Sequence, residues 1–161
     1  MSGKMIVFVC YGNMCRSPMA EGILRSRVDG DIRVLSAGIG AVDGGAHPYA
    51  IKAMEELGID ITDHRRRPLE RWMVEEASYI FALDEYVYDV LASEFNLSSR
   101  LHTLKGFAYG VDEPLGVFDP YGEGLDAFRA CRDEIAELIE KAIERGLLDQ
   151  AVQAHSMQKQ H

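Results

Sequence analysis

Residues 4–18 read KMIVFVCYGNMCRSP, and the order of apolar, loop and helix-starting residues in them indicates the class of fold. The first seven residues are almost all apolar and include several β-branched side chains, which is typical of a central parallel strand buried on both faces. Residues 11–13 interrupt the apolar run. Ser17 and Pro18 then predict the start of a helix, because serine is a favourable N-cap and proline fits the first helical position. The stretch is therefore a strand, a short loop and a helix in direct succession.

Strands and helices continue to alternate along the rest of the chain. Short apolar runs predict further strands at residues 31–37, 78–83 and 101–104, and helical periodicity predicts helices at residues 17–28, 48–57, 67–77, 84–95 and 124–146. This alternation predicts an α/β fold of three layers, a four-stranded parallel twisted sheet with helices on both faces. The predicted loop at residues 106–124 is long enough to suggest a function. Ligands of such sheets bind at the carboxyl ends of the strands, where the loop after the first strand lies.

The length and composition indicate one globular domain. The chain has 161 residues, of which 47% are hydrophobic and 27% charged. We expect a single domain over residues 1–149 and a frayed tail over residues 150–161. No apolar run approaches the roughly 18 residues of a membrane span, and the opening run is too short for a signal-peptide core. A cytoplasmic protein without a membrane partner is therefore expected.

The charge distribution restricts the partners. The net charge is −9, which argues against nucleic acid, but residues 1–71 carry +1 and residues 72–161 carry −10. An anion site is therefore expected in the first half. The three cysteines, Cys10, Cys15 and Cys131, do not suggest a disulfide framework or have the spacing of a zinc site. We accordingly expect no metal.

The loop after the first strand has the parts of a phosphate-binding nucleophile site. Backbone N–H groups at the start of a helix, together with the helix dipole, attract anions. The planar guanidinium of Arg16 can grip two phosphate oxygens. Cys10 stands where these groups would stabilise its thiolate, and a thiolate held against phosphate is a phosphoryl-transfer nucleophile. Ser17 can donate a hydrogen bond to that thiolate.

The segment VCYGNMCRSP at residues 9–18 resembles the signature VCxGNxCRSP of the low-molecular-weight protein tyrosine phosphatases. The resemblance continues through Ser36, His64 and Asp119 with Tyr121, and covers nearly all of residues 4–146. It implies a cytoplasmic phosphoric monoester hydrolase that needs no metal or organic cofactor. Its substrates would be phosphorylated proteins, and inorganic phosphate, sulfate or vanadate would bind in the loop.

The resemblance also implies a role for each site residue. Cys10 would be the nucleophile, Arg16 the phosphate clamp and Asp119 the general acid and base. The residues alone leave Asp112 and Glu113 as rival carboxylates on the same long loop, and the family pattern selects Asp119. The other implied site residues are those that form or line the phosphate pocket, Tyr11, Gly12, Asn13, Met14, Cys15, Ser17 and Tyr121, and those of the supporting network, Ser36 and His64.

Two substrates are possible, phosphotyrosine and phosphoarginine, and one other reaction, arsenate reduction, competes with phosphatase activity. Met14 favours phosphotyrosine, because the protein arginine phosphatases of the same fold carry threonine there. Residues 36–45 and 119–124, however, look more like the arginine-phosphatase branch. Arsenate reductase would need relay thiols near the third strand, and residues 78–100 contain no cysteine.

The remaining cysteines and the basic segment have plainer interpretations. Cys15 is either a reversible disulfide partner that protects Cys10 from over-oxidation or a small buried side chain. Cys131, far along the chain, is expected to be inert core. Residues 65–67 are three consecutive arginines, which we interpret most simply as a solvated face, the alternative being that they steer phosphorylated partners.

Overall fold

The computed structural model describes residues 3–149, and its centre is a sheet of four strands. The strands are β1 (Met5–Cys10), β2 (Arg33–Gly38), β3 (Tyr79–Ala82) and β4 (Leu101–Thr103), in the spatial order β2-β1-β3-β4. All neighbouring strands are parallel. The predicted α/β class and parallel sheet are confirmed. The tail predicted at residues 150–161 lies outside the described residues.

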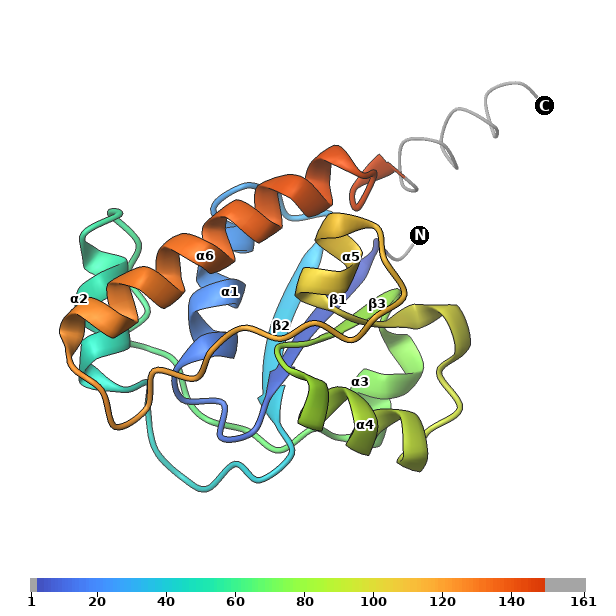
Figure 1. The fold of residues 1–161 in the computed structure, drawn as a ribbon, viewed down its shortest axis with the longest axis horizontal. Helices are drawn as coiled ribbons and strands as arrows, with labels where there is room; N and C mark the ends of the chain where they lie inside the picture. The colour runs from blue at the N-terminus through green and yellow to red at the C-terminus, as the bar shows by residue number, and fades with distance from the viewer. Residues whose placement is uncertain (1–2, 150–161) are drawn as a thin grey trace.

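Helices cover both faces of this sheet (Figure 1). They are α1 (Arg16–Arg25), α2 (Pro48–Glu55), α3 (Arg71–Glu76), α4 (Glu85–Glu94), α5 (Leu104–Tyr109) and α6 (Leu125–Glu144), with a 3₁₀ turn η1 (Ser98–Arg100) before β4. Within residues 3–149, no helix has the length and apolarity that crossing a bilayer requires.

The side chains of β1 alternate between two hydrophobic cores. Ile6 and Phe8 pack with residues of α1, α2 and α6, whereas Val7 and Val9 pack with residues of α3 and α4. All six residues of β1 are buried, which explains why its sequence is a continuous apolar run. Each fully buried side chain of this size stabilises the fold by about 1.5–3 kcal/mol. The strand that carries Cys10 is therefore the most firmly held element of the sheet.

Two predicted helix boundaries were wrong. The helix predicted at residues 17–28 is α1, and its N-cap is Cys15, because the Ser17 hydroxyl bonds to Cys10 Sγ instead of capping the helix. The helix predicted at residues 67–77 shrinks to α3, because Pro68 pairs with Gly38 at the end of β2. Residues 67–69 thereby extend the sheet edge beside the loop between β1 and α1.

The loop predicted at residues 106–124 begins with an unpredicted helix, α5. Thr103 caps it by accepting a hydrogen bond of 2.9 Å from the Gly106 N–H, and Gly110 ends it in the left-handed conformation with φ 69°. The irregular segment is therefore residues 110–124, which we call the acid loop. It returns across the carboxyl ends of β1 and β3 to reach α6.

Candidate active site

The chain between β1 and α1, residues 10–17, forms a tight loop around the Cys10 sulfur, and we call it the phosphate loop. Cys10 is only 3% exposed. Its Sγ accepts a hydrogen bond of 3.2 Å from the Asn13 N–H and lies 2.9 Å from Ser17 Oγ. When Cys10 is a thiolate, Ser17 is the donor in this second contact, since a thiolate can only accept. Two donors therefore stabilise negative charge on the sulfur.

The same loop offers further donors to an anion above the sulfur. Within residues 3–149, the backbone N–H groups of Gly12 and Met14 donate to no protein acceptor. The first turn of α1 begins at Arg16, so the positive end of the helix dipole points at this loop. Backbone N–H groups without a protein acceptor, in a loop that enters a helix, are donors that can form an anion-binding nest.

Arg16 is fixed at the base of the site by groups from two other segments. It is 3% exposed, and its Nη1 donates to Asp84 Oδ2 at 2.9 Å and to the Val117 carbonyl at 2.8 Å. Burial alone would lower the pKa of this guanidinium, but Cys10 and the neighbouring carboxylates raise it above its ordinary value. The anchors occupy Nη1 and leave Nε and Nη2 to grip phosphate oxygens.

Asn13 holds the loop in its strained conformation. Its φ of 55° is left-handed, and its side chain is fully buried. Its Nδ2 donates to Ser17 Oγ and to Ser36 Oγ at 2.9 Å each, and its Oδ1 accepts from the Arg67 N–H at 3.0 Å. One side chain thus ties the phosphate loop to the ends of β2 and of the segment that pairs with it.

A second tier of polar groups lies beneath Asn13. His64 Nε2 donates to the Asn13 carbonyl at 2.8 Å, because a carbonyl oxygen can only accept. Burial lowers the pKa of His64, so the ring is neutral at pH 7. Ser36 Oγ donates to Glu21 Oε1. Sequence reasoning missed Glu21, although a carboxylate on the inner face of the predicted helix was a usable signal.

Asp119 stands at the mouth on the acid loop. It is the one of the three candidate carboxylates Asp112, Glu113 and Asp119 that lines the cavity over Cys10. Its Oδ2 lies 3.6 Å from Arg16 Nη2, and its side chain is 51% exposed. The Val117 N–H donates to the Leu83 carbonyl at 2.8 Å, which ties the acid loop to the end of β3.

The cavity above Cys10 has a volume of about 430 Å³ and largely apolar walls. Tyr11, Met14, Val42 and Tyr121 line it, together with the polar residues described above. Gly40 lets the loop after β2 approach, since a Cβ there would lie 2.6 Å from the Tyr11 ring. These walls surround a slot that suits a flat, apolar group attached to a phosphate.

The other two cysteines are buried beside the site. Burial, followed by the charges of Asp119 and Cys10, raises the pKa of Cys15 to about 12. Burial raises the pKa of Cys131 to about 12 as well. Cys131 is buried in the hydrophobic core on α6, as predicted, and its Sγ lies 3.7 Å from the Phe118 carbonyl on the acid loop. Both side chains are thiols at neutral pH.

Two further residues of the site escaped the sequence reasoning. Asp84 comes directly after β3 and caps α4 through Val87, and the end of a buried parallel strand was the available signal. The three consecutive arginines were interpreted as a solvated face, but Arg66 is half-buried and lines the cavity. Within residues 3–149, no cluster of side chains has the geometry of a metal site.

Comparison with known families decides what this arrangement is. The family model described as "Low molecular weight phosphotyrosine protein phosphatase" matches residues 5–156. The chain belongs to this family. It is accordingly a cysteine-dependent phosphoric monoester hydrolase, as the resemblance of residues 9–18 implied.

Curated relatives of this phosphatase carry different activities. A probable low molecular weight protein-tyrosine-phosphatase EpsP of Ralstonia nicotianae is 38% identical over 88% of this chain and 92% of that protein. A protein-arginine-phosphatase of Geobacillus stearothermophilus is 34% identical over 87% and 94%. An arsenate reductase of Halalkalibacterium halodurans is 34% identical over 91% and 99%.

Similar solved structures include both tyrosine and arginine phosphatases. The low molecular weight protein tyrosine phosphatase of T. tengcongensis superimposes with a TM-score of 0.82 at 34% identity, covering 89% of this chain and 99% of that one. The YwlE arginine phosphatase of Geobacillus stearothermophilus gives a TM-score of 0.79 at 31% identity, covering 98% and 97%. These proteins belong to one family but carry names of different activities. The substrate of this chain must therefore be argued from the shape and chemistry of its cavity.

Proposed function

We propose that this phosphatase hydrolyses phosphotyrosine in proteins through a phosphocysteine intermediate. The observation that carries the proposal is the position of the Cys10 sulfur at the base of a cavity whose walls are Tyr11, Met14 and Tyr121. The phosphate of a tyrosine reaches the sulfur only at the end of a long, flat side chain, and these walls match that shape. A cytoplasmic site of action remains a prediction from the sequence.

In the first step, the Cys10 thiolate attacks phosphorus while the bond from phosphorus to the tyrosine oxygen breaks. Arg16 and the N–H groups of the phosphate loop hold the charge on the equatorial oxygens. Asp119, protonated, gives its proton to the departing phenolate oxygen. The products are a dephosphorylated tyrosine side chain in the substrate protein and a phosphoryl group on the sulfur of Cys10.

In the second step, water attacks the phosphocysteine and the bond from sulfur to phosphorus breaks. Asp119, now a carboxylate, accepts a proton from this water. Ser17, 2.9 Å from the sulfur, donates a hydrogen bond to the departing thiolate. Inorganic phosphate leaves and the thiolate is restored.

Phosphoarginine is the second candidate substrate, because arginine phosphatases are among the similar proteins. Its guanidinium is polar and cationic, and the cavity presents Met14 and the cation of Arg66. Both features favour phosphotyrosine. The arsenate reductase reaction has less support, because residues 78–100 hold no cysteine and the two remaining cysteines, Cys15 and Cys131, are buried.

The proposal is tested with two peptides of one sequence, bearing either phosphotyrosine or phosphoarginine. We expect kcat/KM for phosphate release to favour phosphotyrosine at least tenfold, which corresponds to about 1.4 kcal/mol. Met14→Thr should reduce the ratio of kcat/KM for the phosphotyrosine peptide to that for the phosphoarginine peptide, and Cys10→Ser should abolish both activities. A wild-type preference for phosphoarginine would overturn the proposal.

A further inference from the structure

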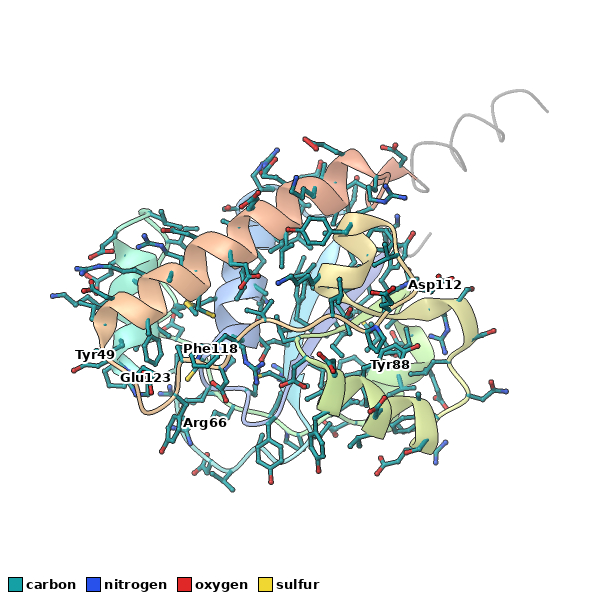
Figure 2. The ribbon with its side chains drawn as sticks, in the orientation of Figure 1. Tyr49, Arg66, Tyr88, Asp112, Phe118 and Glu123 are labelled. Carbon is teal, nitrogen blue, oxygen red and sulfur yellow. The ribbon has the colours of Figure 1, made fainter. Side chains whose placement is uncertain are left out.

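The reaction described above leaves one cavity residue without a task. Arg66 lines the cavity together with Cys10 and Asp119, but it does not hold the nucleophile, the phosphate clamp or the acid. Its neighbours Arg65 and Arg67 are exposed, whereas Arg66 is half-buried. Figure 2 shows Arg66 beside the loops that follow β1 and β2.

The loop after β2 holds Arg66 in place through two hydrogen bonds. The Arg66 backbone N–H donates to the Gly44 carbonyl at 2.8 Å, and its Nε donates to the Gly45 carbonyl at 2.8 Å. Gly44 has a φ of 144°, and a Cβ there would lie 2.8 Å from the Arg66 guanidinium carbon. The positive φ favours glycine at position 44, and the hydrogen bonds to the Gly44 and Gly45 carbonyls hold Arg66 against this loop.

The guanidinium of Arg66 has no anionic partner among the residues that the structure describes. Among the ion pairs of residues 3–149, none includes Arg66, whereas Arg16 pairs with Asp84 and faces Asp119. The Nη atoms of Arg66 donate to no acceptor in the same part of the chain. The positive charge nevertheless reaches the cavity wall, because it opposes the rise of the pKa of Cys15, which also lines the cavity. A fixed cation with two open donor groups at the mouth of a cavity is a place for an anionic group of the substrate.

We propose that Arg66 is a specificity-determining residue that binds the carboxylate of an acidic side chain next to the phosphotyrosine. The proposal rests on the proposed function and names its substrate class, phosphotyrosine in an acidic sequence. The phosphate itself is already gripped by Arg16 and the loop N–H groups at the base, so the cation at the wall serves a second anion. The chain as a whole is strongly acidic, at −9, and Arg66 supplies a local attraction that offsets the repulsion of acidic substrates.

The test compares two phosphotyrosine peptides that differ only in the flanking residues, which are glutamate in one and glutamine in the other. The measured quantity is the ratio of their kcat/KM values within each variant, because any loss common to both peptides cancels. We expect the wild type to favour the glutamate peptide about tenfold at low salt, with the preference falling as salt is added. Arg66→Gln should bring the ratio close to one, Arg66→Lys should keep part of it and Arg66→Glu should invert it.

Arg65→Gln is the matched control, since it removes the same charge from the adjacent exposed position and should leave the ratio unchanged. A wild type that cleaves both peptides equally would overturn the proposal. The same holds if Arg66→Gln slows both peptides by one factor, which is the signature of a merely structural role, or if Arg65→Gln lowers the ratio equally. Failure of the wild type to cleave either peptide, while it still hydrolyses p-nitrophenyl phosphate, would instead overturn the proposed phosphotyrosine activity.

Discussion

The phosphate loop and the acid loop meet over one cavity but are built in opposite ways. In the phosphate loop, Cys10, Asn13 and Ser17 are buried, and each is bonded to another member of the loop or to the network below. In the acid loop, Asp119 and its neighbour Phe118 are exposed, at 51% for the Asp119 side chain and 69% for Phe118. The loop is tied down before this point, through Val117.

The difference follows from what each loop has to do. A nucleophile and its oxyanion donors must not reorganise during the reaction, so burial and full hydrogen bonding suit them. A residue that is the acid of the first step and the base of the second must meet first the leaving group and then a water molecule, so an exposed position at the mouth of the cavity suits it. Arg16 connects the regions, since its Nη1 donates to the Val117 carbonyl of the acid loop. The predictions below ask how far the two regions can be separated.

The largest effect is expected where the two regions join. Arg16→Lys keeps the charge but loses the planar fork that contacts Asp84, Val117 and the phosphate together. We expect kcat/KM on a phosphotyrosine peptide to fall about 10³-fold. Steady-state kinetics measure this, with Arg71→Lys, on the exposed start of α3, as the matched control. A loss below tenfold would mean that the fork is not needed.

A smaller loss is expected from the acid loop alone. Asp119→Asn removes the proton donor without changing the shape of the side chain, and kcat on a phosphotyrosine peptide should fall about 10²-fold. The first step with p-nitrophenyl phosphate should suffer less, because its leaving group needs little protonation. Asp112→Asn is the control on the same loop. Equal losses on the two substrates would argue against a proton donor.

The rigid region should respond in stability as well as in activity. Asn13→Ala removes the bonds to Ser17, Ser36 and the Arg67 N–H and leaves a left-handed φ of 55° to an alanine. We expect unfolding to become easier by about 2–4 kcal/mol, with about a tenfold loss of kcat. Urea denaturation and kinetics measure the two effects. Asn96→Ala, on an exposed asparagine, should change neither, and a fully stable Asn13→Ala would refute the role of the network.

The smallest effect concerns the layer below Asn13. The pKa of His64 is lowered from its ordinary 6.5 by burial, so the unfolded chain binds a proton at a higher pH than the folded one. The contribution of His64 is therefore present above about pH 6.5 and is lost as the pH falls through the lower folded pKa. Urea melts between pH 7.5 and 5.5 should show stability declining on acidification. His64→Gln should reduce this slope, and an unchanged slope would contradict the assignment.

The comparison of the two loops also explains how much the sequence could predict. The phosphate loop lies within residues 9–18, where a strand, a turn and a helix follow one another directly in the sequence. The local pattern of residues was therefore sufficient to predict this loop. The strand order could not be read from the sequence, and neither could the partners of Arg16. Asp84 lies 68 residues away from Arg16, and only the parallel sheet brings the ends of β1 and β3 together.

The errors arose where tertiary contacts outweighed local propensity. Ser17 has the ideal side chain for an N-cap, but its hydroxyl serves Cys10. Pro68 suits a helix start, but Gly38 recruits its segment to the sheet. One of the three arginines at residues 65–67 is half-buried, because the glycine-containing loop after β2 packs against the side chain of Arg66. Such choices depend on the shape of the partner, which no local pattern encodes.

The measurement that tests the central claim most directly is the trapping of the phosphoenzyme. Asp119→Asn should form the phosphocysteine rapidly from p-nitrophenyl phosphate and then hydrolyse it slowly, because the base for the second step is missing. Acid quenching, digestion and mass spectrometry should find one phosphoryl group on the peptide that contains Cys10. Its absence there, or its presence on another residue, would contradict the account of Cys10 as the nucleophile.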